Sequence, residues 1–441
     1  MHPPPTWATD ARRKLAQKKA KNAGTAGRAI GAVIGSDGES DASDEPSGDE
    51  DEVDNLFRAT TSKSRGRRIR GGLLDKGEID IDRVRDANQE ESSSVRQNKI
   101  TWMADLGRGG VGRADWPVSC GKQSSIVEIG FHPRAQVLFS ATSDRRLRLF
   151  QIDGTTNSLL TTLHVPELPI AAASYHPSGS SILLTGPRPF FMSYDLQSGS
   201  VLRSPRGLLT ADLSGTSTGG LNHATFSPDG DTLAVGGRRG HVHLVDWGKG
   251  GAATGQVVGE VKMNVAVKGV AWQKGGRELL TLGEDAEVYC WDVGERKCVS
   301  RWRDEGGFGA CQIAASGSGF TAVGSTTGIV NIYDPATPAP VNGEERKALK
   351  AVGNLTTAVS TMRFNHDAQL LAVASKTNKD ALKLVHLPSA SVYANWPTQQ
   401  TPLHHVTAVD FSKRSEYLAV GNARGKVLLY NLKAYSSGKR E

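Results

Sequence analysis

The stretch SIVEIGFHPRAQVLFSATSDRRLRLFQIDG (Ser125–Gly154) contains the pattern that decides the fold. Its first apolar run ends at Phe131, and the turn-forming pair His132-Pro133 follows directly. A second apolar run leads to another turn and then to a segment in which apolar and polar residues alternate. Alternation between turn signals is typical of half-buried β-strands. The stretch therefore predicts short strands joined by tight turns.

The same pattern recurs along the rest of the chain, at intervals of 41 to 51 residues. Its anchor positions are Phe131, Tyr175, Phe226, Trp272, Ile313, Phe364 and Phe411. The fifth copy is the weakest, because Ile313 replaces the aromatic residue. A WD40 blade has about 40–45 residues, and Trp291-Asp292 is the dipeptide that gives such repeats their name. We therefore expect an all-β protein with a seven-bladed WD40 β-propeller over residues 125–433, followed by a C-terminal tail at 434–441.

The seventh copy ends near Lys433, so its outermost strand must come from another part of the chain. We expect residues 99–124 to form a linker that contains this latch strand, with Arg113–Cys120 as the candidate. Trp116 would then be a packing residue. A strand shared between distant segments would close the ring and protect its sheet edges.

The first 98 residues predict a largely disordered N-terminal tail. Gly35–Asp54 is an acidic low-complexity run with few apolar residues, which cannot bury enough surface to offset the entropy of ordering. One interpretation is a solvated tail of mixed charge. The other is a nuclear or nucleolar targeting and RNA-contact arm. The candidate residues for the second role are Lys63, Arg65, Arg67, Arg68 and Arg70.

Composition narrows the class of protein. Residues 1–116 carry equal numbers of acidic and basic side chains, so the net charge of +7 lies in the repeat region and favours acidic partners. The four cysteines lack metal-ligand spacing and are expected to be buried free thiols. The chain has no apolar run of the roughly 18 residues that cross a bilayer, and its start lacks the apolar core of a signal peptide. We therefore expect a soluble intracellular protein with no membrane contact.

Motifs for catalysis, cofactors and metals are missing from the sequence. The glycine-rich Arg108–Gly112 has no lysine and no preceding strand, so it is interpreted as a linker and not as a phosphate-binding loop. His132 and His176 precede prolines and are interpreted as turn formers. Asp144 and Asp285 are expected to accept hydrogen bonds from backbone N–H groups at turns. We expect a binding protein that is not an enzyme and that needs no cofactor or metal.

The amino-acid sequences of individual repeats identify a protein family more specifically than the length of the repeat does. Ser125–Gly154, Arg303–Asp334, Leu382–Pro397 and Val406–Leu432 resemble the U3 small nucleolar RNA-associated protein 18 family of WD-repeat proteins. GEIDIDRVRDANQ (Gly77–Gln89) also looks like the stretch that precedes the propeller in that family.

This resemblance implies a function in the nucleolus of the nucleus. It implies a non-catalytic scaffold in the UTP-B subcomplex of the small-subunit processome, which supports U3-dependent processing of precursor 18S ribosomal RNA. The implied partners are other UTP-B and processome proteins, U3 small nucleolar RNA and precursor ribosomal RNA. Some family members recruit the exosome's RNA helicase through a Leu-Phe-x-x-Asp motif, and here Leu56-Phe57 lacks the downstream Asp.

Other uses of a WD40 ring stay open. A substrate receptor of a ubiquitin ligase would need an adaptor-binding domain, and residues 1–116 contain no sign of one. A chromatin-binding adaptor would favour an acidic ring, whereas this repeat region is basic. Nucleolar localisation and co-purification with U3 RNA would separate these alternatives.

Overall fold

The structure is a computed structural model that describes residues 74, 77–84, 86–87, 124–154, 157–205, 221, 223–248, 255–273, 275–340, 342–398 and 401–436. The chain divides into two units, 1–63 and 64–441, and all described residues belong to the second. Within them, none of the helices has the length and apolar character needed to span a membrane.

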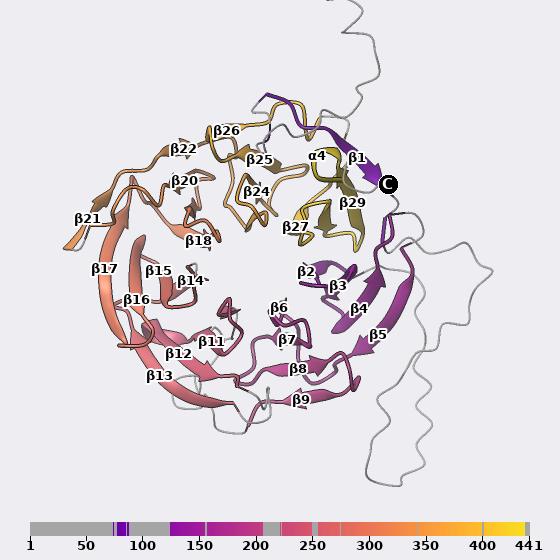
Figure 1. The fold of residues 1–441 in the computed structure, drawn as a ribbon, viewed down its shortest axis with the longest axis horizontal. Helices are drawn as coiled ribbons and strands as arrows, with labels where there is room; N and C mark the ends of the chain where they lie inside the picture. Colours follow the sequence, from indigo (N-terminus) through magenta and orange to yellow (C-terminus); the bar gives the residue numbers. More distant parts are fainter. Residues whose placement is uncertain are drawn as a thin grey trace, which may run out of the picture. The chain divides into compact units, whose positions relative to one another are not determined.

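Seven antiparallel sheets are arranged around a common axis (Figure 1), so the predicted seven-bladed propeller is confirmed. Numbered from the innermost strand outward, the first three blades are β2 (Ile126–Phe131), β3 (Val137–Thr142), β4 (Arg146–Gln151) and β5 (Leu159–His164); β6 (Ala172–Tyr175), β7 (Ser181–Thr185), β8 (Met192–Asp195) and β9 (Val201–Arg203); β10 (Ala224–Phe226), β11 (Thr232–Gly236), β12 (His241–Asp246) and β13 (Gln256–Lys262).

The remaining blades follow the same order. They are β14 (Val267–Trp272), β15 (Glu278–Gly283), β16 (Glu287–Asp292) and β17 (Lys297–Asp304); β18 (Ala310–Ala315), β19 (Thr321–Ser325), β20 (Val330–Tyr333) and β22 (Lys350–Val352); β23 (Thr361–Phe364), β24 (Leu370–Ala374), β25 (Leu382–His386) and β26 (Ser391–Val392); β27 (Val406–Phe411), β28 (Tyr417–Asn422), β29 (Val427–Leu432) and β1 (Ile81–Val84). The short helix α4 (Lys433–Ser436) follows β29.

The fifth blade forms, but Ala315 and not the predicted Ile313 occupies the anchor position, because Ser316 N donates to Phe320 O as His132 N donates to Val137 O. Ile313 on β18 is buried and packs against the neighbouring blade at Gly269 on β14. A Cβ at Gly269 would lie 2.9 Å from the Cγ2 of Ile313, so the glycine provides the space that the isoleucine fills. Ile313 therefore fills the buried position that Ile129 holds in the first blade, and the anchor position itself holds Ala315.

An additional strand joins the fourth and fifth blades. β21 (Asn342–Arg346) lies in the chain between β20 and β22, yet it pairs parallel with β17, the outermost strand of the preceding blade. Its last residue, Arg346, is buried, and its Nη2 donates to the carbonyl oxygens of Asp334 and Thr337 at 2.9 and 2.7 Å. The fourth sheet therefore has five strands, four of them consecutive in sequence.

The seventh blade is closed from the other end of the chain, as Figure 1 shows by the indigo β1 beside the yellow β29. β1 pairs antiparallel with β29 from Ile81↔Leu432 to Val84↔Leu429. The prediction that Arg113–Cys120 is the latch strand was wrong, because β1 occupies that edge. The latch therefore begins inside the predicted tail of residues 1–98, and Arg113–Cys120 and Trp116 lie outside the described residues.

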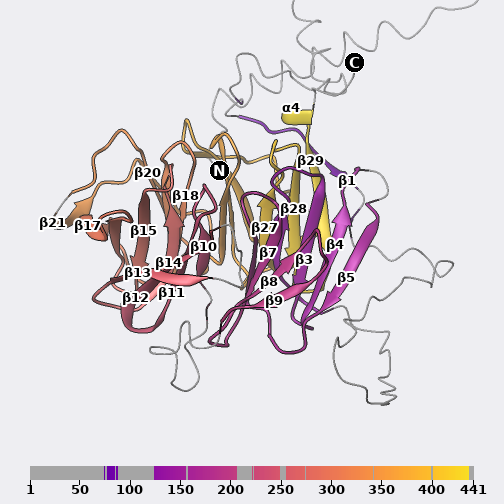
Figure 2. The same ribbon diagram turned by 60° about the horizontal axis from the view of Figure 1, so that its bottom comes forward.

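The ends of the strands define two faces of the ring, and Figure 2 shows the strands running between them. Because consecutive strands are antiparallel, the turns from second to third strand share one face with the connections between blades. We call this the b–c face; its turns are residues 143–145, 186–191, 237–240, 284–286, 326–329, 375–381 and 423–426. The opposite, a–b face carries the turns from first to second strand.

Candidate interaction sites

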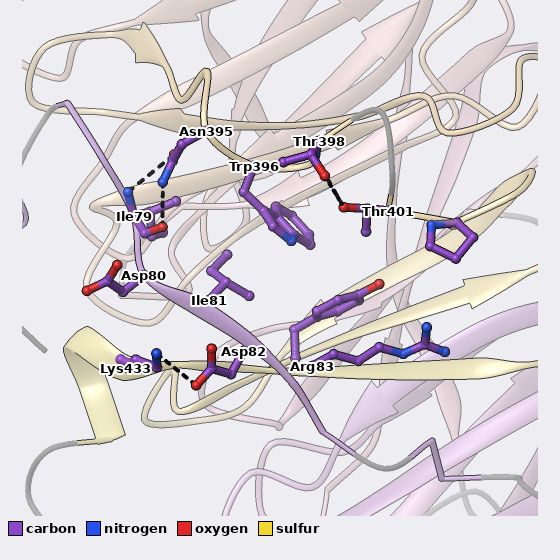
Figure 3. A pocket seen from close by; sticks show the side chains of 12 residues that line it. Ile79, Asp80, Ile81, Asp82, Arg83, Asn395, Trp396, Thr398, Thr401 and Lys433 are labelled. Atoms are coloured by element: carbon purple, nitrogen blue, oxygen red, sulfur yellow. Dashed lines mark hydrogen bonds and ion pairs between the residues drawn. The ribbon is translucent and has the colours of Figure 1, made fainter. Parts of the chain in front are cut away.

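A groove lies where the latch strand crosses the sixth and seventh blades (Figure 3). We call it the latch groove. It has a volume of about 560 Å³, and its walls are Ile79, Asp80, Ile81, Asp82, Arg83, Asn395, Trp396, Thr398, Thr401, Pro402, Tyr430 and Lys433. The latch segment forms one wall, and the connection between β26 and β27 forms the other.

Hydrogen bonds at both ends of the latch segment hold this wall in place. The side-chain amide of Asn395 clamps the backbone of Ile79: its Nδ2 donates to the Ile79 oxygen at 2.7 Å, and its Oδ1 accepts from the Ile79 nitrogen at 3.3 Å. Lys433 Nζ lies 2.8 Å from Asp82 Oδ2, and Lys433 N donates to the oxygen of Asp80 at 3.1 Å. Figure 3 shows these partners along one side of the groove. The latch is therefore fixed by main-chain contacts as well as by sheet pairing.

The floor of the groove is aromatic and contains a hydroxyl without a partner. The rings of Trp396 and Tyr430 meet edge to face with centroids 5.0 Å apart. Tyr430 is buried, and its hydroxyl makes no hydrogen bond to a residue that the structure describes. Burial raises the pKa of Tyr430 to about 12, although the guanidinium of Arg83 opposes the shift. The other two hydroxyls, Thr398 and Thr401, bond to each other at 2.9 Å.

A charged cluster lies at the opposite, inner edge of the ring. It joins Glu128 on β2, Arg363 on β23 and Asp410 on β27, the innermost strands of the first, sixth and seventh blades. Arg363 Nη2 lies 3.2 Å from Glu128 Oε1, and Asp410 Oδ2 accepts from Phe131 N at 2.8 Å. Burial raises the pKa of Asp410 to about 6 against the opposing charge of Arg363. The cluster therefore links three blades around the point where the ring closes.

Histidines on the a–b face do more than form turns. His132 Nδ1 accepts from Arg134 N and Ala135 N at 3.0 and 2.7 Å, which caps its own turn. With Nδ1 accepting, Nε2 carries the hydrogen and donates to Gly179 O in the next blade at 2.9 Å. His176 repeats this contact to Gly230 O, also at 2.9 Å. The turn assignment was right, and these side chains also join adjacent blades.

The two aspartates of the turns differ from each other. Asp285 Oδ1 accepts from Glu287 N at 3.2 Å, as predicted. Asp144 instead accepts from the hydroxyl of Thr142 and lies 3.5 Å from the guanidinium of Arg148. The prediction of a backbone contact for Asp144 was therefore wrong, because a neighbouring arginine occupies its carboxylate.

Basic side chains recur in the turns of the b–c face. Exposed basic side chains occupy the turns of the sixth, seventh, first, second and third blades, and we call them the basic arc: Lys376, Lys379, Arg424, Lys426, Arg145, Arg188 and Arg239. The turn of the fourth blade carries Glu284 and Asp285 instead, and the turn of the fifth has no charged residue. The face is therefore divided into a basic sector and a sector without basic turns.

The tail residues singled out in the sequence lie outside the described residues: Leu56, Phe57, Lys63, Arg65, Arg67, Arg68 and Arg70. Three cysteines are described and all are free, as expected. Only Cys290 is buried, whereas Cys298 is exposed and Cys311 is partly covered, so the expectation of burial was too general.

Comparison with known proteins matches this chain to a family profile and to several related proteins. The WD domain, G-beta repeat family matches residues 207–246. The U3 small nucleolar RNA-associated protein 18 homolog of Arabidopsis thaliana is 38% identical over 313 residues, which cover 71% of this chain and 55% of the plant protein. The Homo sapiens homolog is 34% identical, and the match covers 70% of this chain and 54% of the human protein. The Saccharomyces cerevisiae protein is 30% identical, and the match covers 71% of this chain and 58% of the yeast protein. The chain thus spans little more than half the length of these relatives.

Proposed function

The chain belongs to the U3 small nucleolar RNA-associated protein 18 family, and we propose that it is a non-catalytic scaffold of the nucleolar small-subunit processome. There it joins the UTP-B subcomplex and supports U3-dependent processing of precursor 18S ribosomal RNA. The observation that carries the proposal is the identity of 30–38% to relatives that are named for U3 RNA, over about 70% of this chain.

The architecture supports a scaffold. A closed ring of seven sheets offers two faces and a rim, so several partners have separate surfaces. The basic arc would contact phosphates of U3 RNA or precursor ribosomal RNA, with an affinity that falls as salt rises. We propose that protein contacts dominate and that these phosphate contacts support them.

The direct test is purification of the tagged chain from nucleolar extract, with U3 RNA measured in the eluate. We expect U3 and other processome proteins to be enriched, and depletion of the chain to cause unprocessed 18S precursor to accumulate. Recovery without U3, together with a ubiquitin-ligase adaptor or histones, would instead support the substrate-receptor or chromatin alternative.

A second proposal concerns the tail. Leu56 and Phe57 would recruit the exosome's RNA helicase, and the basic cluster Lys63–Arg70 would direct the chain to the nucleolus. The test is a pull-down of the helicase with the full chain and with Leu56→Ala plus Phe57→Ala. Equal recovery by both would end the helicase proposal. Nucleolar fluorescence that survives replacement of the five basic residues by Gln would end the targeting proposal.

A further inference from the structure

We propose that Phe308 is an aromatic anchor through which the b–c face of the fourth and fifth blades docks on an apolar pocket of another protein. This surface deepens the proposed scaffold function, on which it rests, by naming where one protein partner is held. Phe308 lies in the connection from β17 to β18, within the family-like stretch Arg303–Asp334.

Phe308 differs from the other apolar side chains on the surface. It is 79% exposed, whereas those on the outer strands, such as Leu160 at 50%, keep about half of their surface covered. Ile329, 42% exposed, lies in the neighbouring b–c turn of the fifth blade. Single exposed apolar residues are common on proteins. An exposed phenylalanine with a second apolar side chain in the adjoining turn offers the aromatic contact in which interface cores are enriched.

The loop that carries Phe308 is held rigidly on its β19–β20 side. Ser325 Oγ donates to Phe308 O at 2.6 Å, and Thr326 N donates to Gly309 O at 2.9 Å. Gly309 has a φ of +61°, a left-handed conformation that other residues rarely adopt. The backbone on this side is therefore fixed before any partner arrives.

The other side of the loop rests on the fourth blade. Gly307 N donates to Asp304 O of β17 at 3.1 Å, while Glu305 N donates to Tyr333 OH of the fifth blade at 3.1 Å. A Cβ at Gly307 would lie 2.7 Å from the Cβ of Ala286, so the loop packs directly on the acidic b–c turn. An anchor that is already ordered loses little conformational entropy on binding.

The charges around Phe308 favour a protein over an RNA. The loop packs on the turn that carries Glu284 and Asp285, and Lys268 is engaged with Glu284 at 3.2 Å. An RNA base stacked on Phe308 would bring its phosphates beside these carboxylates, whereas the basic arc lies on other blades and reaches the loop only with Lys376, near Cys311. We therefore infer a partner pocket that is apolar at its centre and basic at its rim.

The first arm of the test measures retention of the full chain on particles purified through U3 RNA. Phe308→Ala should lower retention after washing by about tenfold or more, as expected for an aromatic hot spot. Phe308→Leu should restore most of it, and Leu160→Ala serves as the matched surface control. Retention of Phe308→Ala within twofold of the wild type would overturn the proposal. A wild-type chain that lacks U3 would instead refute the proposed function.

The second arm places a photo-reactive phenylalanine analogue at position 308 or at position 160 of the full chain in cells. Because the chain is then isolated under denaturing conditions, this arm does not depend on U3. The proposal expects a crosslink from position 308 to one protein, at a peptide that lines an apolar pocket with Lys or Arg at its edge. Crosslinks to RNA, or crosslinks no stronger than those from position 160, would overturn it.

Discussion

The fourth and seventh blades both contain four antiparallel strands in the order of a propeller blade, but the strands come from different parts of the chain. The fourth is built from consecutive strands β14 to β17, and β21 is added outside a sheet that is already complete. The seventh contributes only three consecutive strands and borrows β1 from a segment before the first blade. The stability of the fourth blade is therefore local, whereas that of the seventh depends on contacts between distant parts of the chain.

Removing the borrowed strand should have the largest effect. We expect deletion of residues 74–87 to lower the free energy of unfolding by about 3–6 kcal/mol. Leu74 and Ile79 are both buried, and each such side chain contributes about 1.5–3 kcal/mol. Replacing Asn342–Glu345 of β21 with a Gly/Ser linker should cost less, because β17 stays in a four-stranded sheet. Chemical denaturation measures both, and equal losses would contradict the comparison.

The charged cluster gives the next largest effect. Arg363→Met leaves two carboxylates, Glu128 and Asp410, without their cation. The matched control is Arg301→Met in the fourth blade, where Glu287 is the ion-pair partner. The two pairs are equally accessible to solvent: Arg363 and Glu128 are 43% and 19% exposed, and Arg301 and Glu287 are 39% and 20% exposed. Since solvent weakens both pairs, we expect Arg363→Met to cost about 1–2 kcal/mol and Arg301→Met less than about 1 kcal/mol. Equal costs would show that Asp410 contributes nothing.

Asp410 should also make stability depend on pH. Its pKa of about 6 lies above the value of roughly 3.9 for an unfolded chain. The folded state therefore binds the proton more tightly, so this stabilisation is complete below pH ~4 and is lost as pH rises through about 6. Asp410→Asn should flatten the decline in unfolding free energy between pH 4 and 7. A profile identical to that of the wild type would refute the assignment.

The smallest effect is expected in the latch groove. Tyr430→Phe removes a buried hydroxyl that has no partner, so stability should stay within about 0.5 kcal/mol or rise slightly. The fourth blade offers the contrasting case, because Trp291 Nε1 donates to Thr281 Oγ1 at 2.8 Å. Thr281→Val, which keeps the side-chain shape and leaves the indole N–H without its acceptor, should cost about 1–2 kcal/mol. Thermal unfolding of the two variants compares the loss of a polar group that has no hydrogen-bond partner with the loss of a hydrogen bond that is formed.

The sequence predicted the repeat architecture well, because each blade carries its own alternation and turns. It also implied a borrowed strand, since the last repeat stops at Lys433. The position of that strand was missed because IDRV (Ile81–Val84) has two charged central residues and resembles a tail more than a strand. The signal for this strand in the sequence was the resemblance of Gly77–Gln89 to the stretch that precedes the propeller in the family.

The interaction sites were harder to foresee for a related reason. Glu128, Arg363 and Asp410 lie in three separate repeats, and only ring closure brings them together. Phe308 lies in a loop whose exposure depends on contacts with two neighbouring turns. Features that arise between repeats leave no periodic signal, whereas His132 and His176 were noticed because they recur within the repeat.

The borrowed strand also sets an order of events during synthesis. β1 leaves the ribosome before any blade, but its partner β29 follows about 350 residues later. At roughly 5–20 residues per second, β1 waits about 20–70 seconds for its partner. During that interval six blades can form while the ring stays open. Translation speed and early protection of this strand therefore bear on the yield of closed protein.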